Sequence, residues 1–340
     1  MVLTITLTGA NIISQTDSTG NNKNNLLKYS FPTTATFDNH EIALTAVSLY
    51  YSWFNIDAQL YQNSTFYYYW LDSVGNAYPD NLSAANPYYT VTTVDSCGNT
   101  IRTTYYYDAV ADLTYIEYPV VLPDGIYELQ GIVNYLQYVM QKNLTYGKDS
   151  VTQNNVYYVN MQVNPTAYCY DITCYQITVV PPANITYLFP PPPIDFIPLV
   201  KFPTNFNAIV GFTAQNKVDI VTKPSPSVLD KTFVKYSSNV SPQLQPNPTL
   251  VLTCSGVSNP YSSPSTNVYS LSATGVIGSQ IQVFPPTLVW LPLTKGTYPS
   301  LTIGWVAANG QQVNIRDPNM CITFAIRNCN TDVIQIGNQS

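Results

Sequence analysis

Apolar and polar residues alternate along much of this chain, which is the two-residue period of β-strands. In residues 3–7, leucine and isoleucine alternate with threonine, whereas residues 42–53 are apolar almost throughout, as in a strand buried on both faces. Further stretches rich in valine and aromatic residues predict strands at 66–70, 156–163, 172–180, 208–213 and 249–254. We therefore predict an all-β chain with roughly ten strands.

The C-terminal third contains the clearest hairpin pattern. A strand predicted at 301–307 leads into Asn309-Gly310, the dipeptide preferred in two-residue hairpin turns, and residues 312–315 are predicted to return beside it. A last strand is predicted from apolar residues that share one face: Met320, Ile322, Phe324 and Ile326.

One segment has helical spacing instead. Its apolar residues fall on a single helical face: Leu129, Ile132, Val133, Leu136 and Met140. Glu128 in the first turn and Lys142 in the last suit the helix dipole, and Gly147 can end the segment. The pattern predicts one amphipathic helix that covers the edge or end of a sheet.

Many strands, long loops and one helix predict a single jelly roll, an antiparallel β-sandwich formed by residues 1–60 and 111–327. Residues 61–110 lie in a region that holds about half of the 29 tyrosines, and we interpret them as a Tyr-rich insertion or loop region with an aromatic, nearly neutral surface. Residues 181–203 are rich in proline, which cannot donate to a β-ladder, so they are predicted to form an extended surface segment. Residues 328–340 are predicted to be a C-terminal tail.

Charge changes this picture of the surface. Charged residues make up 9% of the 340 residues, against roughly 25% in a typical soluble domain. Thirteen Lys and Arg against nineteen Asp and Glu give a net charge of -6, which argues against direct nucleic-acid binding. Uncharged polar and tyrosine side chains cost less to desolvate and are typical of interfaces. We expect a protein that packs against other proteins.

No targeting or membrane segment is predicted. No stretch approaches the roughly 20 consecutive apolar residues of a membrane span. The first residues lack the basic region and long apolar block of a signal peptide, and predict a strand instead. Without a secretory route, we expect the cysteines to be reduced: Cys97, Cys169, Cys174, Cys254, Cys321 and Cys329.

The sequence contains no catalytic, cofactor-binding or metal-binding motif that we recognise. His40 is the one histidine, so a multi-histidine metal site is excluded, and we interpret it as a hydrogen-bonded loop residue. Gly275 and Gly278 lack the third glycine and the helix of a dinucleotide loop, and Lys295 precedes a turn where a phosphate loop needs a helix. We predict no enzyme, no cofactor and no metal.

Two groups of residues leave questions open. Asp72, Asp108 and Asp124 are isolated in sequence, and nothing predicts that they meet as an acid–base pair. Cys169 and Cys174 could lie near each other on adjoining turns, but they lack the paired spacing of zinc or redox sites. Whether any cysteines pair is not decided by the sequence.

Three stretches carry a family resemblance when taken in order. Residues 122–137 begin with a Pro-Asp-Gly turn that leads into the amphipathic helix, and residues 202–212 end in Gly-Phe. Residues 250–327 contain Pro285-Pro286, the Asn309-Gly310 turn and the sequence Ile-Arg-Asp-Pro-Asn before the last strand. This ordered set resembles the minor capsid and penton (vertex) proteins of double-stranded DNA viruses of the double-jelly-roll lineage, which include virophages, polinton-like viruses and giant-virus relatives.

The resemblance implies a structural viral capsid protein of the virion shell, made and assembled in the host cytoplasm or nucleus. It implies a penton protein that forms homopentamers at icosahedral vertices and contacts the major capsid protein and other shell proteins. One alternative is a minor capsid (cement) protein away from the vertex. Another is a carbohydrate-binding attachment module, because jelly rolls also host lectins and the Tyr-rich insertion offers rings that stack on a host-surface glycan.

Overall fold

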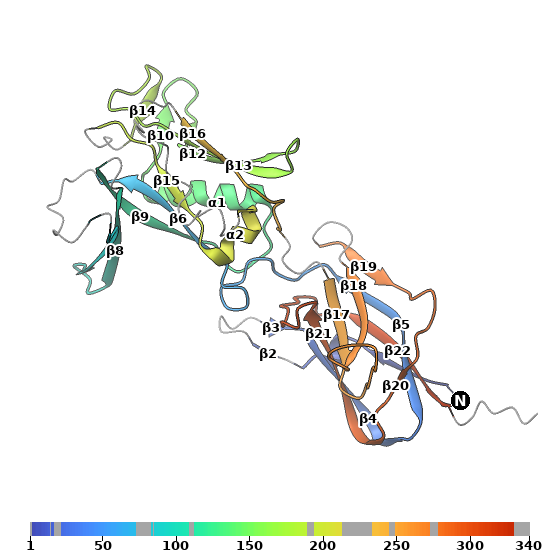
Figure 1. The fold of residues 1–340 in the computed structure, drawn as a ribbon. Helices are drawn as coiled ribbons and strands as arrows, with labels where there is room; N and C mark the ends of the chain where they lie inside the picture. Colours follow the sequence, from blue (N-terminus) through green and yellow to red (C-terminus); the bar gives the residue numbers. More distant parts are fainter. Residues whose placement is uncertain are drawn as a thin grey trace, which may run out of the picture. The chain divides into compact units, whose positions relative to one another are not determined.

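The computed structural model describes residues 2–13, 15–16, 22–72, 83, 85–108, 112–188, 194–212, 233–244, 249–272 and 278–329. Figure 1 shows its strands and two helices, coloured along the chain. The chain divides into two compact units. The first combines Met1–Asn55 with Asn247–Ser340, and the second is Ile56–Pro246. The second unit is therefore inserted, in sequence, into the first.

The first unit is a jelly roll. Its principal strands are β1 (Val2–Leu7), β4 (Leu26–Phe37), β5 (His40–Tyr50), β17 (Thr249–Cys254), β18 (Asn267–Ser272), β19 (Gln280–Val283), β21 (Gly296–Ala307) and β22 (Cys321–Asn328). One sheet has the order β1-β22-β5-β19, and the other has the order β18-β17-β21-β4. These strands pair antiparallel, and when they are renumbered along this unit the sheets read 1-8-3-6 and 5-4-7-2, which is jelly-roll order. The predicted fold class is confirmed.

Shorter elements complete this unit. They are η1 (Gly9–Asn11), β2 (Gln15–Thr16), β3 (Asn22–Lys23) and β20 (Leu291–Pro292). β20 pairs with β5, as β19 does, so β5 is bordered by both.

The core of the jelly roll follows from the alternation of its strands. In β1, Ile5 and Leu7 are almost fully buried, while the threonines between them are exposed. Trp305 in β21 and Phe324 in β22 are fully buried, and they bring residues from both sheets into one cluster. The two inner faces thus form a single sandwich core.

The second unit is a mixed assembly of strands and helices. Its strands are β6 (Thr65–Leu71), β7 (Tyr88–Val94), β8 (Thr100–Asp108), β9 (Leu113–Val121), β10 (Gly147–Asp149), β11 (Asn155–Val156), β12 (Val159–Asn164), β13 (Cys169–Tyr175), β14 (Ile185–Tyr187), β15 (Leu199–Lys201) and β16 (Phe233–Ser237). They form sheets of order β15-β6-β9-β8-β7, β12-β13-β16 and β11-β10-β14. The helices α1 (Leu129–Lys142) and α2 (Thr204–Val210) share one apolar core with the first two of these sheets (Figure 1).

The division of the chain differs from the predicted one. We expected residues 111–327 to belong to the jelly roll and residues 61–110 to form the insertion, whereas everything in Ile56–Pro246 belongs to the second unit. The amphipathic helix α1 begins at Leu129, as its spacing predicts, but it belongs to this inserted unit. A two-residue period of apolar residues indicates that one face of a strand is buried. It does not indicate which sheet the strand joins.

Three of the nine described tyrosines of the predicted insertion are core residues, and the other six are partly buried. Tyr68 and Tyr69 in β6 are fully buried, and Tyr106 in β8 is 4% exposed. Their rings pack beside other aromatic side chains; Tyr69, for example, lies 5.3 Å from Tyr106 between ring centroids. For these residues the expectation of an aromatic surface is wrong. A tyrosine ring is as suitable for a core as a phenylalanine ring when its hydroxyl group has a hydrogen-bond partner. Residues 73–82, 84 and 109–110 lie outside the described residues.

Three local predictions are also corrected. The strand predicted at 208–213 is largely the helix α2, which ends at Gly211 with φ at 79°. The Asn309-Gly310 turn is present, but residues 312–315 form only an isolated bridge, from Gln312 to Val306. The proline-rich segment 181–203 contains β14 and β15, and its Leu199 and Val200 are buried. Residues 189–193 of that segment, and 330–340 of the predicted tail, lie outside the described residues.

Candidate functional site

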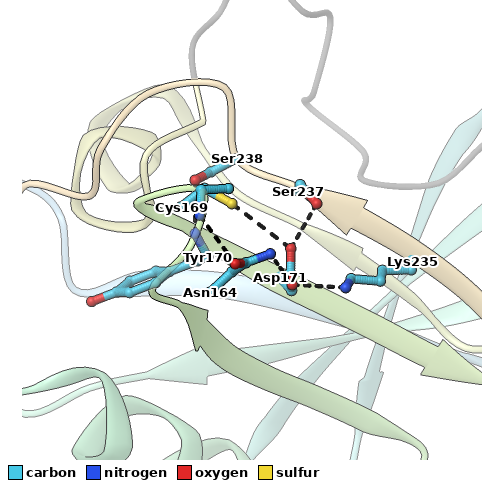
Figure 2. A network of polar contacts seen from close by, with 8 residues as sticks. Asn164, Cys169, Tyr170, Asp171, Lys235, Ser237 and Ser238 are labelled. Atoms are coloured by element: carbon cyan, nitrogen blue, oxygen red, sulfur yellow. Dashed lines mark hydrogen bonds and ion pairs between the residues drawn. The ribbon is translucent and has the colours of Figure 1, made fainter.

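A buried carboxylate joins the three strands of the sheet β12-β13-β16. Asp171 lies on the central strand β13, and its side chain is 2% exposed. Its Oδ2 lies 2.8 Å from Nζ of Lys235, and its Oδ1 accepts a hydrogen bond of 2.6 Å from Oγ of Ser237, both on β16. Asn164 on β12 donates to Oδ2 at 3.0 Å, so each neighbouring strand is tied to β13 (Figure 2).

The adjoining residues extend this network along the strand. The thiol of Cys169 lies 3.8 Å from Oδ1 of Asp171 (Figure 2). Ser238 accepts a hydrogen bond from the backbone N–H of Tyr170 at 2.9 Å and donates to the carbonyl of Val240 at 3.1 Å. The network contains hydroxyl, thiol and carboxylate groups, but no imidazole to act as a base for a nucleophile. Its chemistry is therefore that of a structural tie.

The charge on Asp171 is stabilised by these donors. The Lys235 ammonium and the Ser237 hydroxyl lower the pKa of the Asp171 carboxyl below its usual value. A carboxyl whose pKa is lower in the folded state than in the unfolded state stabilises the fold. This stabilisation is fully present above the unfolded-state pKa of about 4, and it is lost as the pH falls through the folded-state pKa. Acid is thus expected to loosen this sheet.

We expect Asp171→Asn to destabilise the inserted unit by about 2 kcal/mol at pH 7, because the variant loses the ion pair with Lys235 and weakens the contacts of Ser237. The difference from the wild type should shrink as the pH falls from about 4 through the lowered pKa of the folded carboxyl, because the wild-type side chain then also becomes neutral. Urea denaturation across a pH series measures both effects.

A matched control is Asp38→Asn. Asp38 pairs with Lys295 at 3.2 Å, but both side chains are largely exposed, so its loss is expected to cost less than about 0.5 kcal/mol. Equal losses in the two variants, or a difference at Asp171 that does not depend on pH, would contradict the assigned role of Asp171.

A groove of about 660 Å³ lies beside this sheet, in the second unit. One side is α1, which contributes Leu129, Val133 and Gln137. The other side is the sheet, which contributes residues 160–163 of β12 and Tyr170 of β13, together with Leu244 beyond β16. Glu128 is the one charged residue of its lining. The volume is that of a typical ligand pocket, and the mixture of apolar and amide side chains suits an uncharged, partly apolar ligand.

The jelly roll has an exposed apolar loop between β19 and β20. It spans residues 284–290, which carry no charge, and Phe284 and Val289 are 69% and 62% exposed. The end of the loop is fixed by Trp290, whose ring lies 4.2 Å from the guanidinium carbon of Arg327 on β22. Arg327 in turn binds Glu41 on β5 at 2.7 Å. An uncharged apolar loop held by a rigid sheet is typical of an interface.

The histidine and the two cysteines considered in the sequence lie on separate strands, β5 and β13. His40 begins β5, and its Nδ1 lies 2.9 Å from the carbonyl of Asp38, as expected for a loop histidine. Cys169 and Cys174 lie at the two ends of β13, five residues apart and so on opposite faces, which corrects the expectation of adjoining turns. All six cysteines are free, and burial raises the pKa of the Cys174 thiol to about 12.

The three isolated aspartates lie on different elements. Asp72 follows β6 and Asp108 ends β8, and these strands are separated by β9. Neighbouring strands lie about 4.8 Å apart, so the two backbones are roughly 10 Å apart. Asp124 accepts a hydrogen bond from the backbone N–H of Ala58 at 2.7 Å. The described residues contain no cluster of three or more His, Cys, Asp or Glu side chains that could hold a metal ion.

Neither the Asp171 network nor the groove was identified from the sequence. Asp171 is a single charge inside the otherwise uncharged strand residues 169–175, and a buried charge of this kind needs a partner. That signal could have marked Asp171, but its partner Lys235 is 64 residues away in sequence and could not be chosen by spacing. Neither described helix is long and apolar enough to cross a bilayer.

Comparisons with known proteins identify similar solved structures but no similar sequence. No family model and no curated protein sequence matches the chain. The crystal structure of the selenomethionine-labelled mavirus penton protein is similar with a TM-score of 0.38 and 8% sequence identity. The alignment covers 96% of this chain and 97% of that one.

Proposed function

We propose that this chain is a structural protein of a viral capsid and that it forms homopentamers at icosahedral vertices. The observation that carries the proposal is the strand order 1-8-3-6 and 5-4-7-2 of the first unit, because the jelly roll is a recurrent fold of capsid proteins. The ordered motifs at 122–137, 202–212 and 250–327, which resemble those of minor capsid and penton proteins, support the same role.

The surface of the jelly roll suits this role. Five copies around a vertex need a heterologous interface, in which one patch of each copy meets a different patch of the next. Residues 284–290 supply an uncharged apolar loop for such a contact, and charge is depleted at the centres of permanent interfaces. We assign this loop to the contact between copies.

The test is the mass of the purified chain, measured by light scattering after size exclusion over a concentration series. Five copies are expected. A trimer would overturn the vertex role in favour of a different shell component. If the chain is a monomer, imaging of the intact particle decides, because copies placed between capsomers and away from the vertex would identify a cement protein instead.

We expect Val289→Asp to convert the pentamer to monomers, because it places a charge in an apolar contact, while the melting temperature of the chain stays within about 2 °C of the wild type. The matched control is Val151→Asp, which makes the same change at a valine that is 78% exposed in the other unit. Light scattering measures the mass of the assembly that each variant forms. An unchanged pentamer with Val289→Asp, or dissociation with Val151→Asp, would remove the loop from the interface.

A further inference from the structure

In the part of the chain that the structure describes, β12 is an edge strand, and its residues 160–163 line the groove. Within the described residues, the sheet order β12-β13-β16 leaves β12 with a partner on one side only. Its register with β13 continues beyond the strand, since the N–H of Tyr175 donates to the carbonyl of Tyr158 at 2.8 Å. In an antiparallel pair, hydrogen-bonded and non-hydrogen-bonded positions alternate. Positions 160 and 162 therefore also bond to β13.

The intervening residues point their backbone groups the other way. By the same alternation, the N–H and C=O groups of Met161 and Val163 are directed away from β13, toward the free edge. Both residues line the groove, and no described residue is recorded as a partner for these backbone groups. The groove thus offers a row of backbone donors and acceptors alongside the apolar side chains Leu129 and Val133 of α1.

The direction of α1 relative to β12 determines which end of the groove carries Glu128. Near its C-terminal end, Gln141 donates a hydrogen bond to the hydroxyl of Tyr157, just before β12 begins. α1 therefore runs antiparallel to β12, and its N-terminal end, with Glu128 as the N-cap residue, faces the end of β12 at Val163. The groove is uncharged along its length and acidic at this one end.

We propose that the groove between α1 and β12 binds an extended polypeptide segment of a partner protein, which adds antiparallel to β12 as a fourth strand. The backbone of the segment bonds to Met161 and Val163, so the pairing covers the three residues 161–163. Its alternate side chains are apolar and lie against Leu129 and Val133. The residues between them are uncharged and polar and lie beside the amides of Asn160 and Gln162.

Charge complementarity adds one feature to the partner. Because the segment runs antiparallel to β12, its N-terminal end lies next to Val163 and Glu128. The segment therefore carries a lysine or arginine at that end, which pairs with the Glu128 carboxylate. The Asp171 network supports the site from behind, because Asn164 ties the end of β12 to β13. The inference is independent of the proposed capsid role, since it rests only on contacts within the second unit.

The experiment uses the full chain and a fluorescein-labelled peptide of sequence Arg-Val-Thr-Val-Thr-Val. Fluorescence anisotropy is expected to show saturable binding, and hydrogen exchange is expected to show new protection at the amides of Met161 and Val163. A peptide of the same composition with N-methyl groups on alternate residues cannot form the ladder, and it should bind at least about tenfold more weakly.

Variants of the chain locate the site. Val163→Pro removes one outward N–H and should weaken binding about tenfold, because proline blocks strand addition at an edge. Glu128→Gln should weaken binding about threefold and reduce its dependence on salt. Thr166→Ala, an exposed residue beyond the end of β12, is the control and should leave binding unchanged.

If the unmodified peptide shows no binding at 1 mM, the proposal is overturned. Its dissociation constant would then be weaker than 1 mM, which corresponds to a binding free energy of about -4 kcal/mol. So would equal binding of the N-methylated peptide, or protection that appears elsewhere than at β12. If Val163→Pro does not fold, as judged by circular dichroism, the N-methylated peptide makes the same test on the wild-type chain.

Discussion

Trp305→Ala is expected to destabilise the jelly-roll unit by about 3–5 kcal/mol, since it removes a fully buried indole from the middle of the sandwich core. Trp305 lies on β21 between β17 and β4, so the cavity would open between the two sheets, against the middle of this one. A loss of this size is a large fraction of the stability of a typical domain. Guanidinium denaturation followed by far-ultraviolet circular dichroism measures it.

Two further variants separate burial from ring chemistry. Trp290→Ala removes a half-buried ring stacked on Arg327, and it should cost about 1 kcal/mol. Trp305→Phe keeps most of the buried ring, and the indole N–H that it deletes has no hydrogen-bond acceptor among the described residues, so its loss should fall well below that of alanine. Equal losses at Trp290 and Trp305 would contradict the assigned core position.

Gly211→Ala is expected to destabilise the inserted unit by about 3 kcal/mol or more. Gly211 ends α2 with φ at 79°, and a Cβ there would lie 2.3 Å from the carbonyl oxygen of Val240 and 2.9 Å from Oγ of Ser238. Ser238 also accepts the hydrogen bond from Tyr170 N–H, so the segment cannot move aside without breaking that contact. The variant therefore combines backbone strain with a backbone clash.

Gly98→Ala measures the backbone strain of a positive φ without a steric clash. Gly98 lies in the same unit with φ at 84°, but a Cβ there meets nothing within 4 Å. It should cost about 1 kcal/mol, the strain of an L-residue in the left-handed region. Hydrogen exchange of the α2 and β16 amides under native conditions would report both variants. If the two losses are equal, the close approach to Val240 is not the reason for glycine at 211.

What the sequence predicts well is what depends on near neighbours. The strands β1, β5, β17 and β22 and the helix α1 follow from alternation or helical spacing, because burial of one face leaves that period in the residues themselves. The jelly-roll class follows from the number of strands and the turns between them. The predicted penton role remains a proposal.

What the sequence predicts poorly depends on pairing over long distances. Residues 111–246 alternate like the strands of the jelly roll, and only the pairing of β6 with β9 and of β12 with β13 places them in a second core. Tyrosine suits both a surface and a core, so Tyr68 and Tyr106 could not be placed by composition. The site residues Asp171 and Lys235 meet across two strands, and the groove exists only because β12 is an edge.

The insertion also governs the order in which the jelly roll can be built during synthesis. Each of its two sheets takes strands from both sides of the insertion: β1 and β5 need β22, and β4 needs β21. At about 5–20 residues per second, the ribosome needs roughly 14–55 s to pass from the end of the first segment to the end of β22. Until β19 emerges, β1, β4 and β5 have no pairing partners from their own chain, whereas the inserted unit is contiguous and can fold as it emerges. In the nascent chain, the middle of the sequence is thus complete before either end.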